Sequence, residues 1–202
     1  MHIAILTFDG FNELDSLIAL GILNRIKTPG WRVTLSCPTP TVTSMNGVTL
    51  HAQSTLADAC AADAVLFGSG MKTRDIANDP GVMGQLQLDP SRQLIGAQCS
   101  GTLMLAKLGY LQNLPACTDL LTKPWVQEAG VQVLNQPFYA AGNVATAGGC
   151  LSAQYLAAWV IARFEGLDAA RSAMHYVAPV GEKELYVDRA MANIMPFLPV
   201  NP

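Results

Sequence analysis

Charged residues are scarce in this sequence. Only 13% of the 202 residues are charged, and the formal net charge is -3. Proteins that bind nucleic acid or anionic membrane surfaces display clustered lysine and arginine, and this chain has no such cluster. The composition therefore argues against nucleic acid and a membrane as partners, and a small neutral molecule is the substrate class that fits best.

Long hydrophobic runs and a secretory leader are also lacking. The longest apolar stretch in the C-terminal half, 151–164, contains Arg163 and is shorter than the roughly 20 residues that span a bilayer. The first residues, MHIAILTFDG, have neither the basic start nor the small-residue cleavage site of a signal peptide. We expect a buried helix over 151–164 and a cytoplasmic protein.

The cysteines and histidines are too few and too irregular for a disulfide scaffold or a zinc site. The chain has three histidines and five cysteines, with no C-x-x-C pair. Disulfide frameworks use even numbers of cysteines, and zinc sites use closely spaced ligands. We therefore expect no metal, no cofactor and at least one free thiol. The cysteines are Cys37, Cys60, Cys99, Cys117 and Cys150.

Short apolar runs alternate with helical patterns along the chain. Branched apolar runs predict buried strands of a parallel sheet, and apolar residues at three- and four-residue spacing predict helices. The expected strands are 2–8, 31–37, 64–67 and 93–98, with strand pairs over 41–52 and 137–149 and weaker strands at 116–118 and 131–133. The expected helices are 13–26, 76–88, 101–107, 125–129 and 151–164, followed by a mobile surface loop over 178–188 and a closing C-terminal helix.

This alternation predicts an open α/β sheet. Strands that alternate with helices give right-handed crossovers and a parallel sheet covered on both faces, and we expect one such domain over residues 1–202. Ligands in these folds bind beyond the carboxyl ends of the strands. Three predicted strands end at Asp9-Gly10, Gly68-Ser69-Gly70 and Cys99, so these loops should meet at one edge and hold the chemistry.

Cys99 lies where a predicted strand turns into a helix, in LIGAQCSGTLML (94–105). A nucleophile on such a sharp turn needs small residues two positions away, and Ala97 and Gly101 supply them. The amides and positive dipole end of the helix would lower the pKa of the thiol and stabilise negative charge on a substrate. An equally open alternative is that Cys99 is a small buried hydrophobic residue. Cys150, which follows two glycines and precedes a helix, is the internal comparison.

The order of these motifs resembles the ThiJ/PfpI family of the class I glutamine amidotransferase-like superfamily. Four segments show the resemblance: DGFNELDSL, a strand followed by Gly-Ser-Gly, LIGAQCSG, and GNVATAGG before a long helix. They extend over residues 1–166, and the ordered set is far more specific than any single motif. The resemblance implies a flavodoxin-like, mostly parallel sheet sandwiched by helices, with a strand-to-helix nucleophile elbow.

The resemblance also implies roles for individual residues. Cys99 matches the family's nucleophilic cysteine, and Asp15 matches the acidic residue beside it. A partly desolvated carboxyl at Asp15 would have a raised pKa and would move protons next to the sulfur. An ordinary helix carboxylate is the alternative for Asp15, and we expect Glu13 to face solvent. The matches to the oxyanion and substrate-binding loops are Gly68, Ser69, Gly70 and Gly101.

Local features favour one branch of the family. Members that resemble intracellular proteases or amidases usually have histidine directly after the cysteine, where this chain has Ser100. Isonitrile hydratases pair leucine with aspartate on the first helix and have cysteine, threonine and glycine at the elbow; Leu14-Asp15 and Cys99-Ser100-Gly101 look like these. The chain departs from that branch in two places. At 16–19 the family has Leu-Thr-Gly-Pro and this chain has Ser-Leu-Ile-Ala, and at 117–120 the branch has a threonine-histidine-tryptophan segment and this chain has Cys-Thr-Asp-Leu.

The leading hypothesis is a cysteine-dependent hydratase. Cys99 attacks the terminal carbon of a small isonitrile, Asp15 moves the protons, Ser100 orients substrate or water, and an N-substituted formamide leaves. Glyoxalase-like, amidase-like or peptidase-like chemistry on a small carbonyl compound is an alternative, because a thiolate can attack many electrophiles and the fold alone does not determine the substrate.

Two further alternatives involve no turnover. One is a redox sensor in which Cys99 is oxidised to sulfinic acid beside Asp15, and the other is a regulatory binding role. Family members are usually homodimers, so we expect a homodimer. Among the histidines, only His175 is a candidate for a supporting position near the site.

Overall fold

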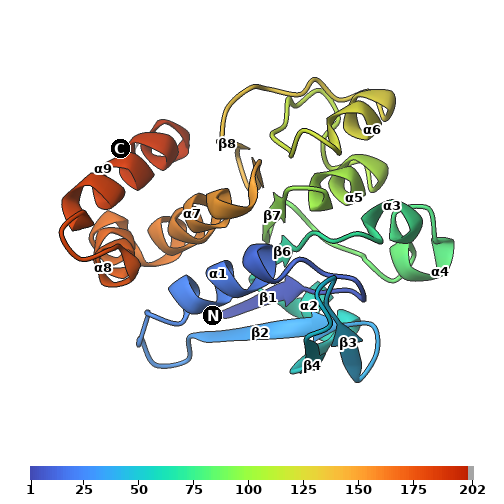
Figure 1. The fold of residues 1–202 in the computed structure, drawn as a ribbon, viewed down its shortest axis with the longest axis horizontal. Coiled ribbons are helices and arrows are strands. Elements are labelled where there is room, and N and C mark those ends of the chain that lie inside the picture. Colours follow the sequence, from blue (N-terminus) through green and yellow to red (C-terminus); the bar gives the residue numbers. More distant parts are fainter. Residues whose placement is uncertain (200–202) are drawn as a thin grey trace.

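The computed structural model describes residues 1–199, and a seven-stranded sheet lies at its centre (Figure 1). The strand order is β5-β2-β1-β6-β7-β9-β8, and neighbouring strands are parallel except for β8 with β9. This confirms the predicted open, mostly parallel sheet. The strands are β1 (His2–Leu6), β2 (Arg32–Cys37), β5 (Ser54–Thr55), β6 (Ala64–Phe67), β7 (Leu94–Gln98), β8 (Phe138–Ala141) and β9 (Val144–Ala147).

The two predicted strand pairs are also present. The strands β3 (Thr41–Thr43) and β4 (Thr49–His51) form a separate antiparallel hairpin around the Asn46-Gly47 turn. The antiparallel pair of β8 and β9 forms one edge of the main sheet, and β9 ends at Ala147, shortly before the helical segment that begins at Cys150.

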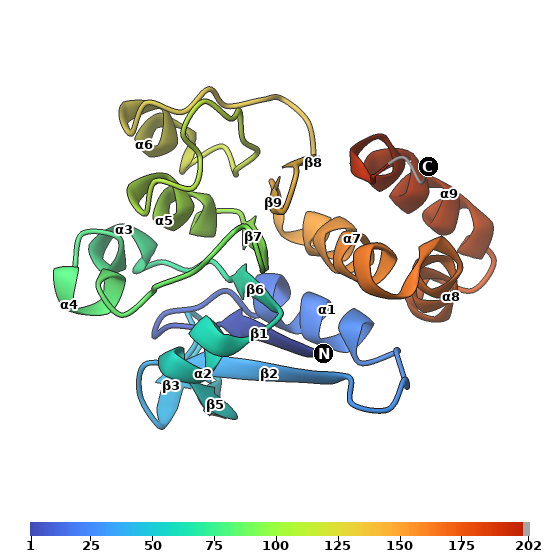
Figure 2. The ribbon, with the colours of Figure 1, turned by 180° about the vertical axis from the view of Figure 1, so that it is seen from behind.

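Helices cover both faces of the sheet. Alternate side chains along β1 enter different cores, with Ile3 and Ile5 on one face and Ala4 and Leu6 on the other. Figures 1 and 2 show α7 to α9 on one side of β7 and β8, and α5 and α6 on the other. The helices of the first face are α1 (Glu13–Leu23), α7 (Ala153–Glu165), α8 (Leu167–Val177) and α9 (Lys183–Ile194). Those of the second are α2 (Leu56–Ala61), α3 (Thr73–Ile76), α4 (Pro80–Met83), α5 (Gly101–Lys107) and α6 (Lys123–Glu128).

The apolar segment at 151–164 is the buried helix that its composition predicts. It begins as the 3-10 turn η1 (Cys150–Ser152) and continues as α7, whose Trp159 is fully buried. Burial of such a side chain stabilises the fold by a few kcal/mol, on the order of 3. Within residues 1–199, the structure has no helix that is both long enough and apolar enough to cross a membrane.

Several predicted elements differ from the structure. The helix expected over 76–88 is wrong: two single-turn helices, α3 and α4, replace it, because Asp79 caps a new helix that begins at Pro80. The weak strands at 116–118 and 131–133 reduce to one bridge between Ala116 and Val133. The surface loop expected over 178–188 is shorter than predicted and covers 178–182, because the closing C-terminal helix, α9, already begins at Lys183.

The C-terminal part is more helical than its polar composition suggests. Val187, Ala190, Met191 and Ile194 recur at helical spacing and are buried in the core shared by α7 and α8. The 3-10 turn η2 (Met195–Phe197) follows α9, and Phe197 packs on Phe138 of β8 with ring centroids 5.7 Å apart. The end of the described chain thus closes the β8 edge of the sheet.

Candidate active site

Cys99 occupies a strained turn between β7 and α5. Its backbone φ is 46°, in the left-handed region that residues with a side chain rarely adopt. Such strain costs about 1–3 kcal/mol and persists only where neighbouring groups hold it. The Cys99 N–H donates to the Ala147 carbonyl at 2.8 Å, and the Thr118 hydroxyl donates to the Cys99 carbonyl at 2.8 Å. The predicted sharp strand-to-helix turn is therefore confirmed.

Asp15 lies beside this thiol although it is 84 residues away in sequence. It belongs to the first turn of α1, which Asn12 caps by accepting a hydrogen bond from the Leu14 N–H at 3.0 Å. The Cys99 thiol donates toward Asp15 Oδ1 with a sulfur–oxygen distance of 3.7 Å, and the Ser69 hydroxyl donates to Oδ2. Each carboxylate oxygen therefore has a hydrogen-bond donor, and the sulfur lies within reach of a base.

The pKa of Asp15 is raised, as predicted. Its side chain is only 2% exposed, and burial raises its pKa, while the hydrogen bonds from Ser69 and Cys99 offset part of that rise. Glu13, two residues earlier, has the opposite shift, because its hydrogen bonds with Ser44 and Asn46 lower its pKa. Glu13 lies partly exposed at the surface beside that loop.

The pKa of Cys99 is raised as well, and the lowering predicted from the helix dipole is wrong. Cys99 is 2% exposed; its burial raises the pKa, and the neighbouring Asp15 carboxylate raises it further. Loss of hydration and a nearby negative charge outweigh the field of α5, a helix of seven residues. At neutral pH the resting site is therefore a protonated thiol that donates to Asp15.

Cys150 belongs to the same site and is not an independent comparison. The Asp15 carboxylate and the sulfurs of Cys99 and Cys150 all lie within 4.8 Å of one another. The Asn12 side-chain amide donates to the Cys150 sulfur at 3.3 Å. One carboxylate and two thiols form a donor set that suits a metal with soft-ligand preference. Sequence spacing argued against metal ligands, but the fold assembles these three from distant segments.

The loop after β6 meets the elbow as predicted, and hydrogen bonds link the two segments. The Gly70 N–H donates to Ser100 Oγ at 3.2 Å, and the Ser100 hydroxyl donates to Thr73 Oγ1 at 2.8 Å. Ser100 therefore links the loop to the elbow, and its contact with substrate or water stays a prediction. Close approach is needed here: a Cβ on Gly68 would lie 2.8 Å from Ser16 Oγ, and one on Gly101 would lie 2.6 Å from the Gly68 carbonyl oxygen.

Three further residues belong to the site and are not among those predicted from the sequence. The Gln98 side-chain amide donates to Cys99 Sγ at 3.5 Å and to the Gly149 carbonyl at 3.0 Å, so it links the elbow to the turn that holds Cys150. Asn12 contacts Cys150, and Thr118 contacts the Cys99 backbone. Asn12 could have been found as the cap of the helix that contains Asp15. Gln98 and Thr118 have no distinguishing local signal.

His175 is not part of this site. It lies on α8 and is half exposed, with its Nε2 3.6 Å from Glu184 Oε1 on α9. Its partner is therefore a surface carboxylate, and the supporting position considered for it is wrong.

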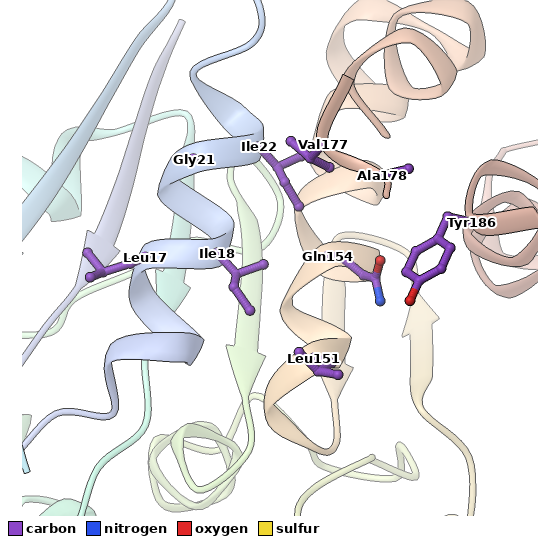
Figure 3. Close-up of a pocket in the computed structure, with 9 residues that line it drawn as sticks. All are labelled: Leu17, Ile18, Gly21, Ile22, Leu151, Gln154, Val177, Ala178 and Tyr186. Atoms are coloured by element: carbon purple, nitrogen blue, oxygen red, sulfur yellow. The ribbon is translucent and has the colours of Figure 1, made fainter. Parts of the chain in front are cut away.

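An apolar groove lies next to the site between α1 and the C-terminal helices. Figure 3 shows Ile18 and Ile22 of α1 on the side of that helix that faces Gln154 of α7, with Tyr186 of α9 across the opening. The groove is flanked by Leu151, the residue after Cys150. Its lining contains neither a thiol nor a carboxylate, so the chemistry lies at Cys99 and the groove is a separate apolar surface.

Neutralising Asp15 is expected to stabilise the fold at neutral pH. Because its pKa is raised in the folded protein, the unfolded chain loses the proton first as pH increases, and the free energy of unfolding falls until the folded pKa is passed. Asp15→Asn removes this loss of stability. Urea unfolding should therefore show a free energy of unfolding about 1 kcal/mol higher than that of the wild type at neutral pH. The gain should shrink as the pH falls below the unfolded-state pKa of about 3.9, where both states of the wild type become protonated.

Glu13→Gln is the matched control on the same helix. The pKa of Glu13 is lowered, so its carboxylate stabilises the fold at neutral pH and that contribution disappears on acidification. Glu13→Gln should therefore be less stable than wild type at neutral pH. Equal pH dependence in the two variants would contradict the electrostatic account of Asp15.

Comparison with protein families identifies the relatives of this chain. The model of the DJ-1/PfpI family matches residues 1–163. No curated protein matches the chain at a significant level.

Solved structures of similar fold cover nearly the whole chain. Schizosaccharomyces pombe DJ-1 is 18% identical with a TM-score of 0.76, over 89% of this chain and 100% of that one. Drosophila melanogaster DJ-1beta is 19% identical with a TM-score of 0.74, over 87% and 97% of the two chains. A ThiJ/PfpI family protein from Pseudomonas syringae is 16% identical with a TM-score of 0.75, over 96% and 87%. At these identities the likeness establishes the fold.

Proposed function

The chain belongs to the DJ-1/PfpI family, and we propose that it is a cysteine-dependent hydratase that converts a small isonitrile to an N-substituted formamide. The observation that supports this most directly is the buried pair of Cys99 and Asp15, in which the thiol donates to the carboxylate across 3.7 Å. A nucleophile and a base in contact, both shielded from water, are what addition to a weak neutral electrophile requires.

The reaction divides into two balanced steps. In the first, Asp15 accepts the Cys99 proton as the sulfur bonds to the terminal carbon of the isonitrile, and Asp15 then gives that proton to the same carbon, leaving a thioimidate. In the second, Asp15 takes a proton from water as the water oxygen attacks the thioimidate carbon. The carbon–sulfur bond breaks, the nitrogen and sulfur each end with a proton, and the formamide leaves. One carboxyl group thus acts first as base and then as acid in each step.

Ser69, Gln98 and Ser100 serve as positioning residues in this proposal. Ser69 holds Oδ2 of Asp15, so that Oδ1 remains directed at the sulfur. Gln98 donates to the sulfur at 3.5 Å and stabilises negative charge that develops there. Ser100 keeps the Gly70 loop against the elbow.

Substrate access is proposed along the turn that follows β9. A cavity lined by Thr118, Asp119, Gly148 and Gly149 opens there, and Thr118 also contacts the Cys99 carbonyl. Cys99 is almost fully buried, so the reacting group must be slender. A linear isonitrile carbon meets that condition better than a peptide carbonyl, which favours the hydratase over peptidase-like activity.

The test is formation of a formamide from an aliphatic isonitrile by the purified protein, with an α-oxoaldehyde and a small amide assayed beside it. Conversion of the isonitrile alone supports the proposal. Turnover of only the oxoaldehyde or the amide would replace it with the glyoxalase-like or amidase-like alternative, and no turnover of any of them would exclude the three enzyme functions.

We also propose a homodimer that covers the apolar surface beside the site. Leu14 and Leu151 are 50% and 67% exposed on elements that pack together, and each is adjacent in sequence to a site residue. Burial of such side chains favours association. Light scattering should give the mass of a dimer for the wild type and that of a monomer for Leu151→Glu. A monomeric wild type would contradict this proposal.

A further inference from the structure

Cys99 and Cys150 form a thiol pair that the proposed hydratase reaction does not require. Their sulfurs lie within 4.8 Å of each other and of the Asp15 carboxylate. They come from different elements: Cys99 follows β7, and Cys150 begins η1. Within residues 1–199, the cysteines are free in the structure, so the pair is in its reduced state.

We propose that peroxide oxidises this pair to an intramolecular Cys99–Cys150 disulfide, with Cys150 as the sulfur that meets the oxidant. The proposal goes beyond the hydratase function and depends only on the geometry of the two thiols and Asp15. The disulfide occupies the sulfur of Cys99, so it reversibly blocks any reaction that uses this nucleophile.

The exposure of the two thiols determines which of them is oxidised first. Cys150 is half-buried and lies in a surface turn, whereas Cys99 is 2% exposed. Hydrogen peroxide therefore reaches Cys150 first. In that step the Cys150 thiol and peroxide give a sulfenic acid and water; the sulfur is oxidised, and the peroxide oxygen–oxygen bond breaks.

Asp15 is placed to promote the second step. The Cys99 thiol donates to Asp15 Oδ1, so the carboxylate accepts this proton as the Cys99 sulfur attacks the sulfenic sulfur of Cys150. The sulfur–sulfur bond forms, and the sulfur–oxygen bond breaks. The leaving hydroxide takes the proton from Asp15 and departs as water. The sum is two thiols and one peroxide giving one disulfide and two waters.

The turn that holds Cys150 can make the remaining approach. A disulfide needs a sulfur–sulfur distance of about 2.05 Å, so a cysteine rotamer or the turn must shift. Gly149 precedes Cys150, has φ 85° and is exposed, and a Cβ on it would meet no atom within 4 Å. Gln98 holds the Gly149 carbonyl at 3.0 Å and keeps the turn next to the elbow. Movement there is local and leaves the sheet intact.

Peptide mapping of the whole protein tests the proposal without any activity assay. The protein is treated with limiting hydrogen peroxide, its free thiols are alkylated, and it is digested under non-reducing conditions with trypsin and a glutamate-specific protease. This digestion separates the relevant cysteines: Cys99 lies on 93–107, Cys117 on 108–128 and Cys150 on 129–163.

The expected product is a cross-link between the Cys99 and Cys150 peptides, lost on treatment with dithiothreitol. Cys99→Ser should leave Cys150 as a sulfenic acid that dimedone labels, because its resolving thiol is absent. Asp15→Asn should still form that sulfenic acid but should slow the cross-link by a factor on the order of 100. Cys60→Ser, which removes another partly exposed thiol, should cross-link as the wild type does.

Three results would overturn the proposal. These are an oxidised Cys150 with no cross-linked peptide, a cross-link from Cys99 to Cys117, or a cross-link only between two chains. A Cys99–Cys150 cross-link in a protein that turns over no isonitrile would exclude the hydratase and leave the disulfide established, so the two proposals fail separately.

Discussion

Cys99→Ala is expected to abolish formamide formation from an isonitrile, with a loss on the order of 10,000-fold or more. The sulfur forms the covalent bond to the isonitrile carbon in the proposed reaction, and without it no thioimidate exists for water to attack. Asp15 alone would face a substrate to which water adds very slowly. The measurement is the rate of formamide production at saturating isonitrile.

Two further variants separate chemistry from folding. Cys99→Ser keeps nearly the same shape at the strained φ of 46° but supplies a far weaker nucleophile, so its rate should also be lost. Cys60→Ser removes a thiol that donates to the Gln85 carbonyl and packs against the core on the α2 side of the sheet, and it should keep the wild-type rate. Retained activity in Cys99→Ala, or an equal loss in Cys60→Ser, would rule out Cys99 as the nucleophile.

The elbow could be predicted because its signals are local, whereas the place of Asp15 beside Cys99 was implied by the family resemblance. A buried strand, a cysteine, a small residue and a helix follow each other between Leu94 and Lys107, and parallel strands bring their carboxyl ends to one edge. The same rule applies to β9, whose end delivers Cys150 to that edge. The use of Cys150 as an independent comparison for Cys99 is therefore wrong, because the sequence prediction applies this rule to three strands and leaves out the fourth.

The electrostatics of the site could not be read from the sequence. The dipole of α5 depends on adjacent residues, but the burial of Cys99 depends on contacts with elements from distant parts of the chain, and Asp15 arrives from α1. These tertiary contributions raise the pKa that local reasoning lowers. Similarly, the sequence predicts the closing helix but not its start at Lys183, because its first turns are stabilised by the core that Val187 and Met191 enter.

The second large effect on stability and activity is expected at Gly101, where the start of α5 lies close to the end of β6. Gly101→Ala is expected to lower the free energy of unfolding by about 3 kcal/mol and to remove turnover. The added Cβ would lie 2.6 Å from the Gly68 carbonyl oxygen and 2.8 Å from that of Phe67. Both are backbone atoms of the sheet and its loop, so neither yields as a flexible side chain would.

Relief of that clash must move the start of α5, which directly follows Cys99 and Ser100. The thiol would then leave its 3.7 Å position beside Asp15, so activity falls together with stability. Gly21→Ala is the control: it lies inside α1, a Cβ there meets no atom within 4 Å, and it should stabilise the fold by about 0.5–1 kcal/mol. Urea unfolding and the formamide assay measure both effects. Wild-type stability in Gly101→Ala would mean that α5 packs less closely against the Gly68 loop than the structure describes, and the fixed geometry of Cys99 and Asp15 would lose its basis.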